Sequence, residues 1–269
     1  MSGAFGTKQG WAEWVQERDE SQKDPYGWLS LVELVWLDEM PKKLANFPGL
    51  WSADGNTVTA VFKKGQPKVY RDGERVKGEF QVDVVPGGES DRSLRDETGR
   101  EIEIAYRFDG PCVRVRDPHA KRLEEYEGLD RYDFDPQWVL RGRLVPYEAV
   151  REIEVPSAID GHMHKLNTWA RADLALPENK ETLSLVVTGE GPEDSSVFFY
   201  DETNGDTTPG WRAAHAAIDG ETVVVDFNRA TIFPAHMSPY GTCPQAPVEN
   251  RIARRVEAGE KTFKGRETE

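Results

Sequence analysis

The sequence predicts a mainly β protein of the α+β class, in which two β-rich halves of sandwich or barrel type carry N-terminal helices packed on one side. Three observations lead to this class. The hydrophobic pattern changes from a helical to an alternating period at about residue 50. The alternating segments are short and antiparallel in character, and Asp-Gly and Gly-Gly pairs, which favour hairpin turns, separate them. The chain has 269 residues, which is long enough to bury a full core.

Residues 8–45 are predicted to be helical. Trp11 and Trp14 fall on one face of the first segment, with acidic residues around the rest. Pro25 ends this helix, because the residue before a proline avoids the α conformation. A second helix is predicted over residues 28–40, where WLSLVELVWLDEM carries an apolar stripe at helical spacing. Such a stripe is typical of a helix that docks on a sheet.

Short strands are predicted throughout the first β-rich half. The segments that alternate apolar and polar residues are TVTAVFK, KVYR, EFQVDVV, EIEIAYRF and CVRVRD. In EIEIAYRF, Ile102 and Ile104 alternate with Glu101 and Glu103. This alternation is expected of a half-buried antiparallel strand.

A proline-containing linker, GLDRYDFDPQWVLRGRLVPYE, is predicted to join the two halves as a strap across a surface, because its aromatic residues need burial. The strands predicted after it are REIEV, GHMHKLNTW, LSLVV, VFFYD and TVVVDF. The predicted organisation is a helical segment (1–48), a first β-rich half (49–148), a second β-rich half (149–264) and a tail (265–269).

Charge and composition narrow the partners that we expect. The formal net charge is −14 and the pI is near 4.9. Nucleic acids and anionic membranes reward clustered Lys and Arg, so neither is an expected partner. The sequence has no apolar run near the ~20 residues of a membrane span and does not begin with a secretory signal pattern. The two cysteines, Cys112 and Cys243, are too few for a disulfide framework, so a cytoplasmic protein is expected. The oligomeric state stays open.

The segment DFNRATIFPAHMSPYGTCPQAPVENR concentrates the candidate ligand-binding chemistry. Asn228 and Arg229 follow a predicted strand, and a loop with four prolines comes next. A polar loop held rigid at a strand end is a common way to build a site. The planar guanidinium of Arg229 suits a carboxylate or phosphate. Asn228, Arg229, Asn250 and Arg251 are therefore predicted to bind a small anionic or carbonyl-bearing molecule. An internal ion-pair network that pins the loop is the structural alternative.

The same loop supplies candidate catalytic residues, namely His236, Tyr240 and Cys243. If the protein is an enzyme, His236 would be the acid or base and Arg229 the charge clamp, in a hydrolytic or lyase-type step. A Cys243 thiolate with His236 as its base is a further alternative, although a cysteine in a tight loop is often a small apolar filler. The competing hypothesis is non-catalytic: the segment is a structural clasp in a binding or scaffold module.

A metal site is a second alternative. His162 and His164 are two residues apart, which on a strand places both on one face. His236, Cys243 or an acidic residue would have to supply a third ligand. Two hydrogen-bonded histidines near a turn explain the same spacing. Phosphate-binding motifs of the GxGxxG and GxxxxGK[ST] types are absent from the sequence, and no cofactor is indicated.

Several segments together resemble a known family. They are DPYGWLSLVELVWLDE, VRDPHAKRLEEYEGLDRYDFDPQWV, FFYDETNGDTT, VVVDFNRA, PYGTCPQAPVENR and VEAGEK. They are similar to the uncharacterised bacterial and archaeal family called domain of unknown function 1684, over roughly residues 9–263. The resemblance implies a soluble, mainly β protein with no established activity. The residues that carry its last motif here are Asn228, Arg229, Tyr240, Cys243, Pro244, Asn250 and Arg251.

One departure from the family pattern bears on chemistry. Where the resemblance leads us to expect a Pro-Cys pair before the tyrosine, this chain has Pro234, Ala235 and His236. A second cysteine in the loop would have supported a paired-thiol or metal role. Its absence puts such a role in doubt for this protein.

Overall fold

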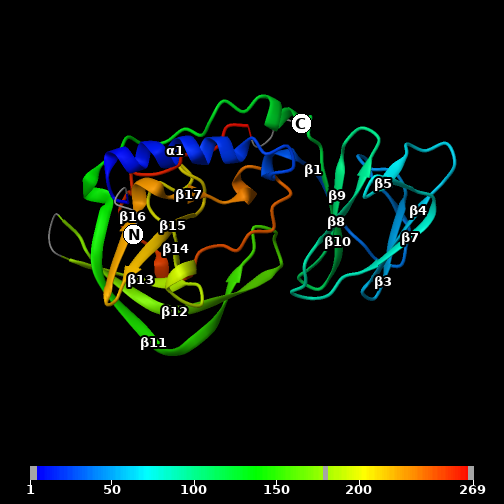
Figure 1. Cartoon of the computed structure of the whole chain (residues 1–269). Helices are drawn as coiled ribbons and strands as arrows, with labels where there is room; N and C mark the ends of the chain where they lie inside the picture. Colours follow the sequence, from blue (N-terminus) through cyan, green and yellow to red (C-terminus); the bar gives the residue numbers. More distant parts are fainter. Residues whose placement is uncertain (1–4, 178–180, 266–269) are drawn as a thin grey trace. The chain divides into compact units, whose positions relative to one another are not determined.

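The computed structural model describes residues 5–177 and 181–265, and it is mainly β, with 45% strand and 14% helix. The predicted fold class is confirmed. The chain forms two compact units (Figure 1). Of the described residues, unit 1 contains 5–21, 127–177, 181–237 and 241–265, and unit 2 contains 22–126 and 238–240. This division differs from the predicted boundaries at 48/49 and 148/149. Most of the predicted tail, 266–269, lies outside the described residues.

Unit 1 contains the helix α1 (Lys8–Gln22) and one antiparallel sheet. The strands of the sheet are β11 (Val139–Pro156), β12 (Met163–Ala175), β13 (Thr182–Thr188), β14 (Ser196–Phe199), β15 (Arg212–Asp219), β16 (Thr222–Asp226) and β17 (Thr231–Ile232). Their order is β14-β13-β12-β11-β16-β15-β17, and β14 also pairs with β15. Six of the strands therefore form a closed ring of pairings. β17 pairs with the first two residues of β15, and β16 pairs with its second half.

The core of unit 1 follows from strand alternation. On β15, Ala214 and Ala216 are buried in the core, whereas Ala213 and His215 face outward. β16 contributes its valines to the same core. The rings of Phe199 and Phe227, for example, meet edge to face with centroids 5.1 Å apart.

A buried ion pair ties the C-terminal segment to this core. Arg212 and Asp201 are both fully buried, with Nη2 and Oδ1 3.2 Å apart. Arg212 also donates to the carbonyl oxygens of Val256 (2.9 Å) and Ala258. The second Asp201 oxygen accepts the Val256 N–H at 2.8 Å. Charged groups are buried only when they are paired and hydrogen-bonded, so Arg212 requires this segment to pass beside it.

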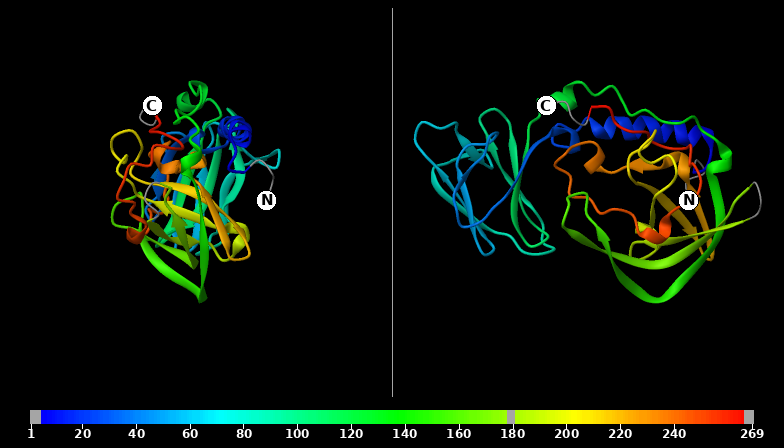
Figure 2. Two further views of the ribbon diagram at one scale, coloured as in Figure 1. Left: turned by 90° about the vertical axis from the view of Figure 1, so that its left-hand side faces the viewer. Right: turned by 180° about the vertical axis from the view of Figure 1, so that it is seen from behind.

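A second buried carboxylate joins the same segment to α1. Glu260 is fully buried, and its carboxylate lies 2.9 Å from Arg18 of α1 and 3.4 Å from Arg131. It also accepts the Ile232 N–H of β17 at 2.8 Å. Figures 1 and 2 both show the C-terminal segment running beside α1.

Unit 2 contains two antiparallel sheets. The six-stranded sheet has the order β1-β10-β9-β8-β5-β6, with bounds β1 (Leu31–Trp36), β10 (Gly110–Arg116), β9 (Glu101–Arg107), β8 (Asp91–Asp96), β5 (Val69–Arg71) and β6 (Glu74–Val76). The four-stranded sheet has the order β2 (Lys42–Lys43), β3 (Leu50–Asp54), β4 (Thr57–Phe62) and β7 (Gly78–Asp83). Apolar side chains of both sheets share one core around the buried Trp51. The four-residue helix α2 (Lys121–Glu124) follows the sheets.

Two predicted elements are wrong. The second helix, predicted over 28–40, is a 3-10 turn, η1 (Trp28–Ser30), followed by strand β1 paired with β10. An apolar run such as LVELVW satisfies either period, and its β-branched valines favour the strand. The predicted linker is a strand from Val139 onward, within β11. Its Pro146 is tolerated because the register with β12 shifts directly after it. Among the described residues, no helix is both long and apolar enough to cross a membrane.

Strand β9 also differs from expectation, because its polar side is buried. Glu101 and Glu103 are only 2% and 3% exposed, against an expected half-buried strand. Glu103 is held by Arg114 (2.5 Å), Arg116 (2.6 Å) and Arg107 (3.1 Å). Burial alone would raise the pKa of Glu103, but the adjacent guanidiniums of Arg114 and Arg116 outweigh it and lower this pKa to about 2. The sequence pattern gave no sign of these partners, because most of them lie on another strand.

We predict that Asp201→Asn destabilises the protein by about 3–5 kcal/mol, because it leaves the buried charge of Arg212 without its counterion. Urea denaturation measures the change. The matched control is Asp206→Asn, which removes a carboxylate that is 63% exposed from its pair with Arg255, and it should cost at most about 1 kcal/mol. Equal losses in the two variants would contradict the structural role of the buried pair.

We predict that the stability supplied by Glu103 is lost as the pH falls from about 4.5 to about 2. The folded-state pKa is lowered, so the unfolded chain takes up the proton first and stability declines with falling pH. Glu103→Gln should therefore cost roughly 2–4 kcal/mol at pH 7 and progressively less in acid. Urea midpoints of wild type and variant, measured between pH 7 and pH 3, test this. A gap that does not change with pH would show that Glu103 is not ionised preferentially in the folded state.

Candidate functional site

Asn228 lies in the 3-10 turn η4 (Phe227–Arg229), which directly follows β16. Its side chain is 1% exposed. Oδ1 accepts the Asp135 N–H at 2.8 Å, and Nδ2 donates to the Asp135 carbonyl at 2.9 Å and to Asp226 at 3.0 Å. The indole of Trp11 donates to the Asn228 carbonyl at 3.0 Å. Asn228 therefore fastens the end of β16 to residue 135 and to α1.

Asn250 performs a similar task between β13 and β14. It ends the 3-10 turn η6 (Val248–Asn250) and is fully buried. Its amide exchanges two hydrogen bonds with the backbone of Val186, at 2.7 and 2.9 Å, and donates to the Phe198 carbonyl at 2.8 Å. The register of β13 and β14 contains the single pair Thr188 and Ser196. The amide of Asn250 thus replaces the ladder hydrogen bonds where the two strands diverge.

Arg229 is the predicted site residue of this segment that lines a hollow. The hollow has a volume of about 330 Å³, and its lining is Phe5, Trp14, Ser196, Ala213, Ala214, His215, Arg229 and Thr231. It therefore lies over the outward side of β15, and no acidic residue contributes to its described lining. The Arg229 guanidinium is 5.1 Å from the ring centroid of Phe5, and that ring meets His215 edge to face at 6.1 Å.

The nearest carboxylate to Arg229 in this segment is that of Asp226. The Arg229 Nε lies 3.6 Å from Asp226 Oδ2, which is beyond ordinary hydrogen-bond length. Burial raises the pKa of Asp226, although bonds from Asn228 and the charge of Arg229 oppose the shift. Arg229 thus lies beside the fully buried Asp226 carboxylate and also lines the hollow.

His236 is not among the described lining residues of the hollow. It ends the 3-10 turn η5 (Pro234–His236), and its ring meets Trp211 with centroids 4.2 Å apart. Trp211 also contacts Phe233, at 6.0 Å. His236 therefore contacts the residue that directly precedes β15, whereas the hollow lies over residues within β15.

The other predicted site residues are dispersed. Tyr240 belongs to unit 2, where the Arg122 guanidinium lies 5.8 Å from its ring. Cys243 is partly buried, and its carbonyl accepts the Ala158 N–H at 2.8 Å. Arg251 is exposed and lies over the ring of Tyr200 at 4.7 Å. The structure therefore brings Arg229 alone of the predicted residues to the hollow over β15.

The two predicted metal ligands make different contacts. The imidazole of His164 is hydrogen-bonded to the Thr242 carbonyl, whereas the backbone carbonyl of His162 accepts the Ser157 N–H at 3.0 Å. Within the part of the chain that the structure describes, no group of three or more His, Cys, Asp or Glu side chains could hold a metal ion.

Sequence reasoning missed the residues that complete the hollow, above all His215. The segment RAAHAAID is rich in alanine and has low β propensity, so β15 was not predicted. Its alternation nevertheless contained a signal, because His215 replaces alanine at a position facing outward. Phe5 and Trp14 carried no signal of a site, since aromatic residues near a helix predict docking.

A model of the family described as "Protein of unknown function (DUF1684)" matches residues 124–261, about half of the chain. The chain belongs to the DUF1684 family. The predicted resemblance is confirmed, over a shorter range than 9–263. A solved structure similar to this DUF1684 protein is the solution NMR structure of an uncharacterized protein of Haloarcula marismortui, with 23% identity and a TM-score of 0.42. The match covers 52% of this chain and 78% of that one. No curated protein matches.

We predict that Asn250→Ala lowers the free energy of unfolding by about 2–4 kcal/mol, because it leaves the buried N–H and C=O groups of Val186 unpaired. The neighbouring Arg251→Ala removes an exposed side chain and should change stability by less than about 1 kcal/mol. Thermal and urea unfolding of the two variants measure the difference. If Asn250→Ala were as stable as Arg251→Ala, the clasp described here would be refuted.

Proposed function

We propose that this DUF1684 protein binds a small anionic or carbonyl-bearing molecule in the hollow over the outward side of β15. The observation that supports this proposal is the character of the lining. Arg229 is the one Lys, Arg, Asp or Glu residue of the described lining, in a protein with a net charge of −14. A hollow without acidic groups is the kind of place on such a surface where an anion gains attraction.

The remaining lining residues favour a planar ligand. Arg229 supplies a fork of N–H donors that fits a carboxylate or phosphate. Ser196 and Thr231 add hydroxyl groups, and His215 adds a titratable ring. Phe5 and Trp14 supply aromatic surface, which is typical of small-molecule sites with a few polar anchors. An aromatic carboxylate fits this combination.

Two hypotheses were given for the segment, a structural clasp and a ligand-binding site, and they apply to different residues. Asn228 and Asn250 are buried and hydrogen-bonded to backbone groups, which favours the clasp for them. Arg229 is partly exposed and lines the hollow, which favours binding for it.

The proposal concerns ligand binding and does not extend to catalysis. The hydrolytic or lyase-type step, with His236 as acid or base and Arg229 as clamp, requires a ligand that extends beyond the hollow, because His236 is not among its described lining residues. Roles for Tyr240 and Cys243 stay predictions.

The test uses benzoate as the probe in saturation-transfer NMR. We expect wild type to bind benzoate weakly, with a dissociation constant of about 1 mM, and Arg229→Gln to bind at least about tenfold more weakly because the charge-assisted pair is lost. Arg251→Gln is the matched control, since it removes an exposed arginine of the same segment, and it should bind like wild type.

Melting temperatures accompany the binding data. Arg229→Lys keeps a positive charge beside the fully buried Asp226 carboxylate, so it should melt within a few degrees of wild type, yet bind benzoate more weakly because the planar fork is lost. Benzoate binding that is unchanged in both Arg229→Gln and Arg229→Lys would reject the proposal in favour of the clasp.

A further inference from the structure

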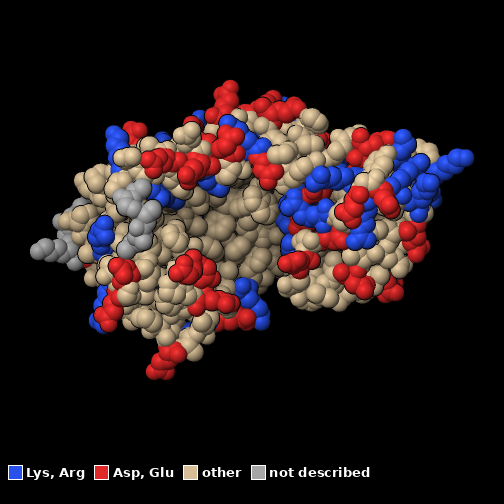
Figure 3. Space-filling view, in the orientation of Figure 1, with Lys and Arg blue, Asp and Glu red and all other residues tan. Residues whose placement is uncertain are grey.

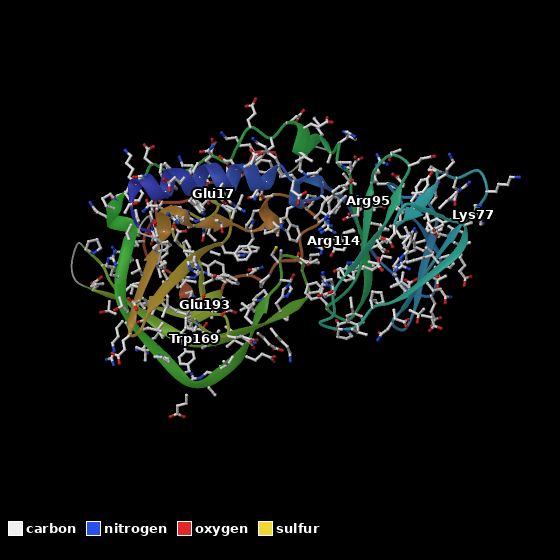
Figure 4. All side chains as sticks on the ribbon, viewed as in Figure 1. Glu17, Lys77, Arg95, Arg114, Trp169 and Glu193 are labelled. Carbon is white, nitrogen blue, oxygen red and sulfur yellow. The ribbon has the colours of Figure 1, made fainter. Side chains whose placement is uncertain are left out.

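The six-stranded sheet of unit 2 has one apolar and one strongly charged face. Ile102 and Ile104 of β9 point into the core of the unit, so Glu101 and Glu103 occupy the opposite face. The residues that pair with these glutamates on the neighbouring strands are Arg95 on β8 and Arg114 and Arg116 on β10. Arg95 and Arg114 are labelled in Figure 4.

The positive charges on this face exceed the negative ones. Glu101 is shared by Arg92 (2.6 Å) and Arg95 (2.9 Å). Glu103 is shared by Arg107, Arg114 and Arg116. Five guanidiniums thus surround two carboxylates, which leaves an excess of three positive charges.

This excess is unusual in so acidic a chain. Residues 22–126 contain 17 Lys and Arg against 19 Asp and Glu, so nearly all of the net charge of −14 lies elsewhere. Figure 3 shows Lys and Arg gathered over the strands of unit 2. An ion-pair network that only stabilises the fold needs balanced charges, because surplus guanidiniums repel one another.

Three of the guanidiniums converge on Tyr26. Arg92 and Arg116 both donate to its carbonyl oxygen, at 3.3 and 2.9 Å, and Arg95 lies 4.4 Å from its ring centroid. The side chains of Arg92 and Arg95 are 42% and 53% exposed, whereas that of Arg116 is 6% exposed. The arrangement therefore has a buried cation beneath two exposed ones.

Donors also outnumber acceptors within the cluster. The Arg114 side chain is 5% exposed, and its Nε has no hydrogen-bond partner among the described residues. Glu101 fixes the guanidiniums of Arg92 and Arg95 side by side, so neither loses much rotamer entropy when it meets a ligand. Such preorganised planar forks match the oxygens of a phosphate group better than lysine would.

We propose that Arg92 and Arg95, with Arg116 beneath them, form a binding site for a small, multiply charged oxyanion of the phosphate class. The site is separate from the hollow lined by Arg229 and does not depend on the function proposed for it. A second negative charge on the ligand is favoured, because the cluster carries more than one uncompensated positive charge.

The experiment is isothermal titration calorimetry with inorganic pyrophosphate at about 20 mM salt, where screening is weak. We expect saturable binding with a dissociation constant below about 1 mM, and weaker binding of inorganic phosphate. Arg95→Gln should weaken pyrophosphate binding at least about tenfold. Arg92→Gln should do the same, and it serves as the second variant if the first does not fold.

Arg75→Gln is the matched control, because Arg75 is exposed on β6 of the same sheet and makes no contact with the cluster in the described structure. Arg75 lies in register with Arg95 through Tyr70, two strands or roughly 10 Å away. Its removal therefore acts only through the long-range field, and it should weaken binding by less than about fivefold. No saturable binding by wild type, or equal losses in Arg75→Gln and Arg95→Gln, would overturn the proposal and leave only a non-specific attraction between charges.

Discussion

The ion pair between Arg212 and Asp201 is the constraint on which unit 1 depends. Arg212 begins β15 on its core side, and its fully buried guanidinium needs a counterion and acceptors for its terminal N–H groups. Asp201 and the carbonyls of Val256 and Ala258 supply them, so the C-terminal segment has to cross this end of the ring of strands. Glu260 lies two residues after Ala258. Its carboxylate contacts Arg18 of α1 and accepts the Ile232 N–H of β17, so both elements lie beside the C-terminal segment. The hollow over β15 is a consequence, because α1 contributes its Trp14.

The residues of the DFNRA to ENR segment separate into two physical kinds. Asn228 and Asn250 are buried amides: Asn250 bonds to backbone groups of β13 and β14, and Asn228 bonds to the backbone of Asp135 and to the Asp226 carboxylate. Their replacement therefore acts on the fold. Arg229 is partly exposed, lies beside the Asp226 carboxylate and lines a hollow without acidic residues in its described lining. One segment of the chain therefore contains both the asparagines that stabilise the fold and the arginine that we propose binds a ligand.

The local sequence pattern predicted much of the fold, because alternation and turn residues act over a few positions. The prediction failed where the residues in contact are far apart in the sequence or where a short segment fits more than one pattern. The strand β1 has an apolar run that fits two periods, and β15 is built from alanines. The burial of Glu103 on β9 depends on Arg114 and Arg116. Both arginines lie on β10, the next strand after the hairpin turn. Asn250 bonds to residues 52 and 64 positions away, so nothing near it in the sequence indicates a clasp rather than a ligand contact. The charge of Arg229 was predictable, but its hollow was not, since Phe5 and His215 come from other elements.

Native-state hydrogen exchange tests the central claim most directly. Among the backbone N–H groups of unit 1 that donate to buried side chains, three are chosen as probes: Ile232 to Glu260, Val186 to Asn250 and Val256 to Asp201. If these side chains hold the unit together, the three amides exchange as slowly as the central amides of β16, with an opening free energy close to that of global unfolding. Exchange of the three at the rate of exposed turn amides would contradict the account.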